Sequence, residues 1–348
     1  MANILILGAG MMGSAMSVPA IDNPGGNSVR IMGTPLDGDI IRHALATGAH
    51  LTMNRPLPEG VRFEEFGIGA MERGLDWADI LICGVSSFGV DWFGETVAPR
   101  VPERLPVLSV TKGLADNGDG TLTPFPRLWE KAAGSRVSFN AIGGPCTSYE
   151  LADRRHSSVV FCGGDVDVLR RLKAALTTDY YHISLSTDVD GVERAAALKN
   201  AFALAVTLAV GMTEAEDGDG CAQAFNPQAA LFGQSVREMS LALELAGADQ
   251  SNLPYGAGDL YVTIYGGRTR KLGALLGRGL PFDQAMARLD GVTLESVVIA
   301  RRVASAIRVL ADKGQARMES FPLLAHVDAL LSGAPGLGIP WRALEIEP

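Results

Sequence analysis

The most constraining feature of the sequence is its opening, where an apolar run leads directly into three spaced glycines. Residues 2–18 read ANILILGAGMMGSAMSV, and Gly8, Gly10 and Gly13 form a G-x-G-x-x-G pattern before a small-residue helical pattern. This strand–turn–helix context is typical of a dinucleotide-binding fingerprint, in which the glycines allow a tight turn, close approach to a pyrophosphate and helix–strand packing. The alternative interpretation is a glycine-rich turn of another α/β protein.

Further apolar runs indicate parallel strands that are buried on both faces. They read VRIMG, DILICGVSS, PVLSVTKGL and SFNAIGG. Ligands of such sheets bind at the carboxyl ends of the strands, and Lys112 and Gly144 each follow one of these ends. We therefore predict an α/β, Rossmann-type doubly wound domain over residues 1–188 and a mainly α-helical domain over residues 189–348.

The end of the second apolar run lacks the acid that usually binds the adenine ribose. That acid is expected about 20 residues after the fingerprint, but Gly33 and Thr34 occupy the place. Asp37 comes slightly late, and Arg42 on the following segment is the nearest arginine that could bind a 2′-phosphate. These residues leave the choice between NAD and NADP open.

Composition narrows the classes of partner. The net charge of −9 argues against general nucleic-acid binding, so an anionic ligand would depend on a local cluster of Lys and Arg. Four cysteines without CxxC spacing favour a reducing compartment, and we expect a cytoplasmic protein. The uncharged apolar stretch over residues 200–213 is too short to span a bilayer, and the histidines show no metal-binding spacing.

The second half has helical periodicity with two polar residues in an apolar run. The predicted helices cover residues 190–213, 226–247, 270–277, 281–289, 293–313 and 319–331. Lys199 and Asn200 lie inside ERAAALKNAFALAVTLAVGM, where an unpaired buried lysine would cost several kcal/mol. They therefore face either a wet cleft or a narrow solvent stripe that continues from Glu193 and Arg194.

A third cluster combines glycines with polar and basic residues. Residues 256–273 read GAGDLYVTIYGGRTRKLG, and they include Asp259, Thr263, Arg268 and Arg270. Glycines beside arginine at the start of a helix suit phosphate binding, although an ordinary basic loop would be favoured if this segment stood alone.

Five motifs in order carry a family resemblance. GAGMMG, TKGL, GGPCTSYELA, ERAAALKNAFA and GAGDLYVT followed by GGRTRKLG resemble glycerol-3-phosphate dehydrogenase over residues 3 to about 315. IMGTPLDGDI and GGRTRKLGALLGRG are most similar to the archaeal-type branch of that family.

The resemblance implies roles for the polar residues. Lys199 matches the proton donor and acceptor at the substrate carbonyl or hydroxyl, and Asn200 a substrate-binding position. Lys112 matches a second lysine between cofactor and substrate. Asp259 matches the aspartate that holds the lysines, and Thr263 approaches the phosphate end of the substrate.

Other positions follow from the same likeness. Gly144 matches the turn that approaches the substrate, and Arg268 the arginine that grips the phosphate and touches the cofactor. Phe88, Ala152 and Glu295 match cofactor-side positions, and Met11 and Met12 of the fingerprint and Thr34 at the end of the second apolar run are further cofactor-side candidates. Two residues depart from the family, because Thr269 replaces the asparagine that follows the arginine and Cys146 replaces a common Ser or Thr. Thr269 keeps a hydroxyl at the substrate site but lacks the paired donor and acceptor of an amide.

The expected protein is therefore an NAD(P)-dependent dehydrogenase that interconverts sn-glycerol 3-phosphate and dihydroxyacetone phosphate, with NADPH slightly favoured. Such an activity supplies glycerol phosphate for phospholipid synthesis, and a homodimer stays open as an assembly. Two alternatives are a β-hydroxyacid-type dehydrogenase for another small anionic substrate and a redox-silent protein that binds a nicotinamide nucleotide. The first places its asparagine further along the helix than Asn200, and the second has no need of Lys199 or Arg268.

Overall fold

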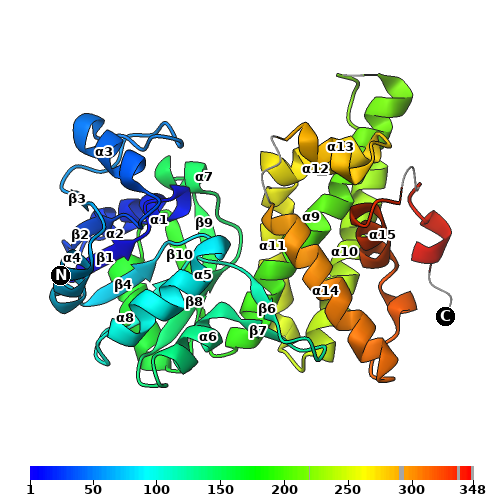
Figure 1. Cartoon of the computed structure of the whole chain (residues 1–348). Helices are drawn as coiled ribbons and strands as arrows, with labels where there is room; N and C mark the ends of the chain where they lie inside the picture. The colour runs from blue at the N-terminus through cyan, green and yellow to red at the C-terminus, as the bar shows by residue number, and fades with distance from the viewer. Residues whose placement is uncertain (219, 290–293, 335–337, 346–348) are drawn as a thin grey trace. The chain divides into compact units, whose positions relative to one another are not determined.

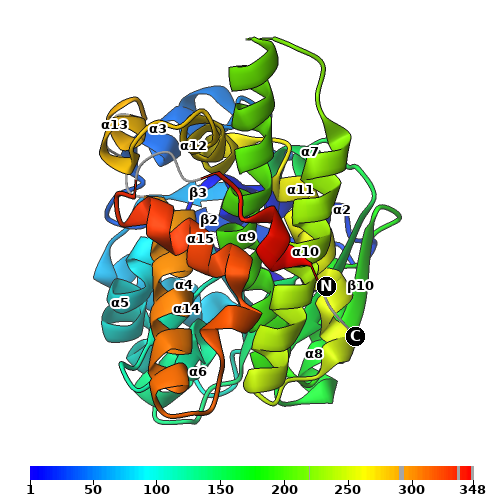
Figure 2. The ribbon, with the colours of Figure 1, turned by 90° about the vertical axis from the view of Figure 1, so that its right-hand side faces the viewer.

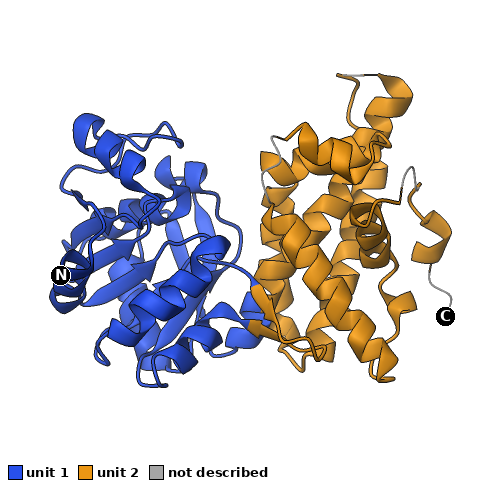
Figure 3. Ribbon diagram, in the orientation of Figure 1, with its two compact units in different colours: residues 1–113, 124–193 blue, residues 114–123, 194–348 orange. Residues whose placement is uncertain are grey.

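The chain forms two compact units in the computed structural model, which describes residues 1–218, 220–289, 294–334 and 338–345. Unit 1 comprises residues 1–113 and 124–193, and unit 2 comprises residues 114–123 and 194–348 (Figure 3). The expected division at residue 188 differs from these units in two respects. The first helix of the second half begins inside unit 1, and a short hairpin from the first half belongs to unit 2.

Unit 1 is built on an eight-stranded sheet with the strand order β10-β9-β8-β5-β4-β1-β2-β3 (Figure 1). The strands are β1 (Asn3–Leu7), β2 (Ser28–Met32), β3 (Arg62–Glu64), β4 (Ile80–Cys83), β5 (Val107–Ser109), β8 (Phe139–Gly143), β9 (Ser157–Cys162) and β10 (Tyr181–Ser186). The six neighbouring strands β3, β2, β1, β4, β5 and β8 are parallel. Their order is that of a dinucleotide-binding domain, as predicted. Strand β9 then pairs antiparallel with β8 and parallel with β10.

Helices cover both faces of this sheet, which explains why residues 4–7 of β1 are all apolar and buried. They are α1 (Met11–Ala15), α2 (Ser17–Asp22), α3 (Gly38–Thr47), α4 (Ile68–Trp77), α5 (Val90–Trp92), α6 (Phe125–Ala132), α7 (Ser148–Ala152) and α8 (Val166–Leu176). Ile4 and Ile6 of β1 share one buried cluster with residues of α2 and α8. On the opposite face, Leu5 packs against Gly74 of α4.

Unit 2 is a bundle of helices around α9 (Figure 2). Its helices are α9 (Val189–Asp217, from Arg194 onward), α10 (Phe225–Leu245), α11 (Leu253–Thr263), α12 (Gly267–Gly277), α13 (Phe282–Ala287), α14 (Glu295–Asp312) and α15 (Pro322–Leu331). Among the described helices α9 is the one long and apolar enough to cross a membrane, but 83% of its most apolar window is buried inside the protein. This burial identifies α9 as a core helix of the protein.

Close helix crossings explain the glycines of this unit. A Cβ on Gly273 of α12 would lie 1.9 Å from Thr207 Oγ1 of α9, so the two backbones approach each other where α12 has no side chain. Helix α11 was not predicted, because Gly256 and Gly258 suggested punctuation between elements. A Cβ on Gly256 would lie 2.8 Å from both Ala195 Cβ and Met239 Cε, so packing against α9 and α10 favours glycine inside this helix.

A hairpin of β6 (Leu114–Asp116) and β7 (Leu122–Pro124) was also not predicted. Residues 114–123 belong to unit 2, where Arg302 donates to the Leu114 carbonyl at 2.8 Å and Arg194 to the Leu122 carbonyl at 2.7 Å. Long-range side-chain contacts of this kind hold the hairpin, and local sequence patterns do not reveal them.

Candidate active site

The three fingerprint glycines form a tight turn between β1 and α1. Gly8 has a φ of +110°, and a Cβ on Gly13 would lie 2.3 Å from the Gly8 carbonyl oxygen. The backbone of Gly84, directly after β4, closes this packing, since a Cβ on Gly8 would lie 2.6 Å from the Gly84 carbonyl carbon. At Gly10 the nearest atom to an added Cβ is the Gly84 carbonyl oxygen at 3.8 Å, an ordinary van der Waals distance, so this glycine is not required by packing. That combination fits a loop whose backbone approaches a pyrophosphate.

The peptide of Ala9, between the first two glycines, is held from both sides. Its N–H donates to Asp37 Oδ2 at 3.1 Å, and its carbonyl oxygen lies 2.9 Å from His50 Nε2. The Nδ1 atom of His50 accepts the N–H groups of Thr52 and Met53, so Nε2 carries the proton and donates to Ala9. Burial lowers the pKa of His50, in agreement with a neutral ring.

The end of β2 carries the residues considered for the adenine ribose. Thr34 donates its backbone N–H to Asp37 Oδ2 at 2.7 Å, so the late acid folds back onto the strand end. The Arg42 guanidinium is bound by Asp39 at 2.6 Å and by Glu65 at 3.3 Å. It is therefore already paired on the surface, whereas the sequence had suggested it for a 2′-phosphate.

The other cofactor-side residues of unit 1 lie near the same edge of the sheet. Met11 and Met12 are the first residues of α1, directly after the glycine turn. Phe88 follows β4 and is 58% exposed, whereas Ala152 ends α7 and is buried. An exposed aromatic ring at the carboxyl end of a strand can contact a bound ligand.

Lys112 and Gly144 follow the neighbouring strands β5 and β8, as predicted. Lys112 is half-buried, and Gly144 turns the chain with a φ of +102°. Glu193 lies near Lys112 and is fully buried, with no hydrogen-bond partner for either carboxylate oxygen among the described residues. Burial raises the pKa of Glu193 to about 8, and the charge of Lys112 acts in the opposite direction. Unit 1 thus brings a buried carboxyl close to the predicted lysine.

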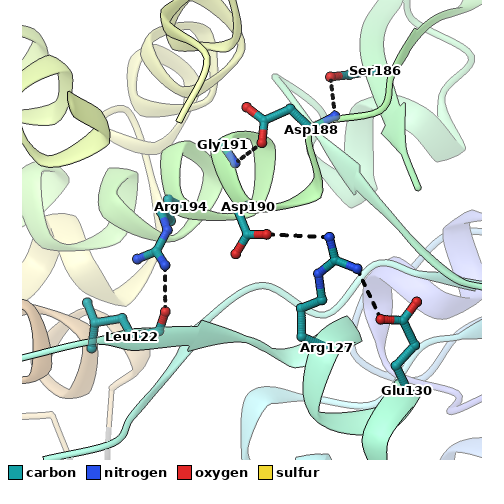
Figure 4. Close-up of polar contacts among 8 residues, drawn as sticks. All are labelled: Leu122, Arg127, Glu130, Ser186, Asp188, Asp190, Gly191 and Arg194. Atoms are coloured by element: carbon teal, nitrogen blue, oxygen red, sulfur yellow. Dashed lines mark hydrogen bonds and ion pairs between the residues drawn. The ribbon is translucent and has the colours of Figure 1, made fainter. Parts of the chain in front are cut away.

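The start of α9 is fixed by polar contacts within unit 1 (Figure 4). Asp188 accepts the Gly191 N–H at 2.8 Å, and Asp190 pairs with Arg127 at 3.5 Å. These contacts orient the first turn of the helix that carries Glu193 and, farther along in unit 2, Lys199.

Lys199 and Asn200 interrupt the burial of α9. Residues 195–198 and 201–211 of this helix are buried, whereas these two side chains keep partial exposure. The stripe that would have continued from Glu193 is excluded, because Glu193 is fully buried. Lys199 and Asn200 therefore form a short, partly exposed patch within an otherwise buried stretch of α9.

Asp259 of α11 is the ion-pair partner of Lys199, which explains how a lysine is accommodated in this mostly buried helix. Its Oδ1 atom lies 2.5 Å from Lys199 Nζ, and the carboxylate is completely buried while the lysine side chain is 13% exposed. Thr263 follows one turn later and donates its hydroxyl to the Asp259 carbonyl at 2.6 Å. Unit 2 thus brings Lys199, from one motif, to Asp259, from another motif that also contains Thr263.

The basic cluster stands at the start of α12. Arg268 is exposed and Thr269 half-buried in the first turn of this helix, behind Gly266 and Gly267. Arg270 is used internally, because it donates to the Ile264 carbonyl at 2.9 Å. Glu295, a predicted cofactor-side position, is exposed at the first residue of α14.

Sequence reasoning missed Gly84, His50 and Glu193 as parts of these sites. Gly84 stands in DILICGVSS directly after an apolar run, and this position was a usable signal for close packing on the fingerprint. His50 is isolated in the sequence, and nothing there connects it with Ala9. The sequence suggested that the Glu193 side chain is exposed to solvent, because a carboxylate in a helix is usually solvated.

The fold and the glycine turn define a class of protein, a dehydrogenase that depends on a nicotinamide nucleotide. Residues 188–335 match the family described as NAD-dependent glycerol-3-phosphate dehydrogenase C-terminus. The chain is 34% identical over 289 residues to the NADP(+)-dependent glycerol-3-phosphate dehydrogenase of Archaeoglobus fulgidus, with 82% of this chain and 83% of the relative covered. It is also 27% identical to the glycerol-3-phosphate dehydrogenase [NAD(P)+] of an Exiguobacterium species, over 85% of this chain and 83% of the relative.

Solved structures agree on the fold. Glycerol-3-phosphate dehydrogenase from Coxiella burnetii superimposes with a TM-score of 0.78 at 24% identity, and covers 99% of this chain and 97% of its own. The chain belongs to the family of NAD(P)-dependent glycerol-3-phosphate dehydrogenases, as the sequence motifs had indicated. Neither alternative class gains support from these similarities.

Proposed function

We propose that the protein interconverts sn-glycerol 3-phosphate and dihydroxyacetone phosphate by hydride transfer with NAD(P)H. The observation that carries this proposal is the pair formed by Lys199 of α9 and Asp259 of α11, whose Nζ and Oδ1 atoms lie 2.5 Å apart. The buried carboxylate holds the Lys199 ammonium in place, and the lysine side chain keeps 13% exposure. It can therefore exchange a proton with a small substrate.

The chemistry assigned to these residues follows from the charge that develops in the substrate. The bound nicotinamide supplies or accepts the hydride. Reduction of a ketone leaves negative charge on its oxygen, and the Lys199 ammonium donates a proton to that oxygen. In the oxidative direction Lys199 accepts the hydroxyl proton, and Asp259 holds the side chain in both directions. We assign Lys112 to the region between cofactor and substrate and Asn200 and Gly144 to substrate contacts, on the basis of the family motifs.

The phosphate of the substrate needs hydrogen-bond donors that are not already used by contacts within unit 2. Arg268 is exposed at the start of α12, and the helix N-terminus adds backbone N–H groups. Thr269 contributes a hydroxyl, so the site keeps a donor although the family asparagine is missing, whereas the Thr263 hydroxyl is bound to the Asp259 carbonyl. We assign Arg268 to both the phosphate and the cofactor.

The cofactor assignment rests on unit 1. We assign Gly8, Gly10, Met11, Met12 and Gly13 to the pyrophosphate loop. The other cofactor-side positions that we assign are Thr34, Phe88, Lys112, Ala152 and Glu295. We infer use of both NADH and NADPH, with NADPH slightly ahead, because the relative from Archaeoglobus fulgidus is NADP(+)-dependent and no acid stands at residues 33–34.

The cellular setting is a further part of the proposal. The four cysteines are free, and burial raises the pKa of Cys83 to about 12, so this thiol is unreactive. We place the enzyme in the cytoplasm, where it supplies glycerol phosphate for phospholipid synthesis. The division into a nucleotide domain and a helical substrate domain is part of the same assignment.

A steady-state assay tests the function. Purified protein is mixed with NADPH or NADH and with dihydroxyacetone phosphate, and cofactor oxidation is followed by absorbance. Turnover with dihydroxyacetone phosphate and little turnover with dihydroxyacetone is expected. Equal turnover of both ketones contradicts the assigned substrate.

A further inference from the structure

Asp37 joins the fingerprint loop to the end of the second strand. Its Oδ2 atom accepts the Ala9 N–H at 3.1 Å and the Thr34 N–H at 2.7 Å. Every hydrogen bond that the described residues make to the Asp37 carboxylate goes to Oδ2, so Oδ1 keeps its acceptor capacity. Asp37 is half-buried, and its carboxylate stands where the ends of β1 and β2 meet.

The position of this carboxylate is fixed by the second contact of the loop. His50 is fully buried and holds the Ala9 carbonyl at 2.9 Å, so Ala9 is bound through both its N–H and its C=O. The loop and the carboxylate therefore form one rigid arrangement, with the charge of Asp37 at a defined place.

The cation nearest in sequence is engaged elsewhere. Arg42 lies on α3, which begins directly after Asp37, and its guanidinium is bound by Asp39 and Glu65. In a dinucleotide-binding fold the adenosine ribose lies at the end of the second strand. A 2′ substituent of this ribose thus lies near the carboxylate of Asp37, while the Arg42 guanidinium is already paired with two carboxylates.

We propose that Asp37 replaces the acid missing at residues 33–34 and limits the preference of the protein for NADPH over NADH. Its Oδ1 atom accepts a hydrogen bond from the ribose 2′-hydroxyl of NADH, and its charge opposes the 2′-phosphate of NADPH. This inference rests on the proposed use of both cofactors, and it names the residue that keeps the advantage of NADPH small.

The test is Asp37→Asn, which removes the charge and keeps one oxygen to accept both backbone N–H groups. We expect the ratio of kcat/KM for NADPH to kcat/KM for NADH to rise by about tenfold. The dissociation constants of both cofactors, measured by fluorescence titration without substrate, should change in the same sense. The increase in the ratio should shrink at high salt, because screening weakens the repulsion in the wild type.

A matched control is Asp79→Asn. Asp79 accepts the Asn3 N–H at 2.9 Å at the opposite end of β1, so the substitution makes the same change in charge and hydrogen bonding away from the ribose. The cofactor ratio should stay at its wild-type value in this variant. An unchanged ratio in Asp37→Asn, or an equal loss of both cofactors, overturns the proposal. Absence of turnover with dihydroxyacetone phosphate, with an altered ratio of dissociation constants, contradicts only the proposed reaction.

Discussion

Lys199 Nζ lies 2.5 Å from Asp259 Oδ1, and the aspartate has no solvent exposure. The two residues come from helices α9 and α11, 60 positions apart in the sequence. A buried ion pair of this kind costs desolvation energy and is weak support for stability on its own, so its presence on a core helix favours a chemical role.

Asp259→Asn should reduce kcat by about 10²-fold, at the lower end of the range for general acid–base catalysis. The loss follows from the lysine ammonium no longer having the carboxylate that holds it in place. Steady-state kinetics with dihydroxyacetone phosphate provide the measurement. Asp328→Asn, which breaks the ion pair with Arg308 elsewhere in unit 2, serves as the control and should leave kcat unchanged. A wild-type kcat in Asp259→Asn would exclude the assigned role.

Arg268→Ala should raise the KM for dihydroxyacetone phosphate and reduce the preference over dihydroxyacetone, since a guanidinium–phosphate contact is charge-assisted. A loss of about 1.5–3 kcal/mol, or roughly 10–150-fold in kcat/KM, is expected for one such contact. Kinetics with both ketones provide the measurement. Arg237→Ala removes an exposed arginine on α10 and controls for the change in net charge. An unchanged preference would show that Arg268 does not bind the phosphate.

Gly10→Ala and Gly13→Ala should separate binding from packing in the fingerprint. Gly10 has a φ of −62°, and an added Cβ would make only an ordinary contact at 3.8 Å, so alanine should keep the melting temperature but weaken cofactor binding. Gly13 has no such room, because the new Cβ would lie 2.3 Å from the Gly8 carbonyl oxygen. Calorimetry and NADPH fluorescence titration distinguish the two. Equal effects of both variants on Tm would contradict this division.

The strands and most helices could be predicted from the sequence because burial leaves periodic apolar patterns. The fingerprint and Lys199 carried strong local signals, whereas the helix that contains Arg268 was expected to begin only at residue 270. The pairing of Lys199 with Asp259 was implied by family resemblance, and geometry was needed to establish it within unit 2. Helix α11 and the position of Asp37 were not predictable, since the first depends on backbone packing at Gly256 and the second on a chain reversal after β2.

Glu193→Gln should change how stability depends on pH. The pKa of this buried carboxyl is raised to about 8, so the folded state binds a proton that the unfolded chain releases near pH 4.5. Wild-type stability should therefore fall as pH rises from about 4.5 to about 8, by at most about 1.4 kcal/mol per pH unit. Thermal unfolding between about pH 4 and about pH 9, a range that brackets this window, measures the slope.

The glutamine variant has no proton to lose, so its stability should vary less over this window than that of the wild type. Glu130→Gln, an exchange of a partly exposed carboxylate that pairs with Arg127 on α6, should preserve the wild-type slope. Parallel curves for wild type and Glu193→Gln would contradict the assignment of the titrating group.

The most direct test of the central claim is turnover of dihydroxyacetone phosphate by the wild type and by Lys199→Ala, measured together with NADPH affinity. The account predicts a loss of ~10²–10⁴ in kcat, as expected when a general acid is removed, with a dissociation constant for NADPH within about twofold of the wild type. Near-wild-type turnover by Lys199→Ala would contradict the claim that this lysine transfers the proton.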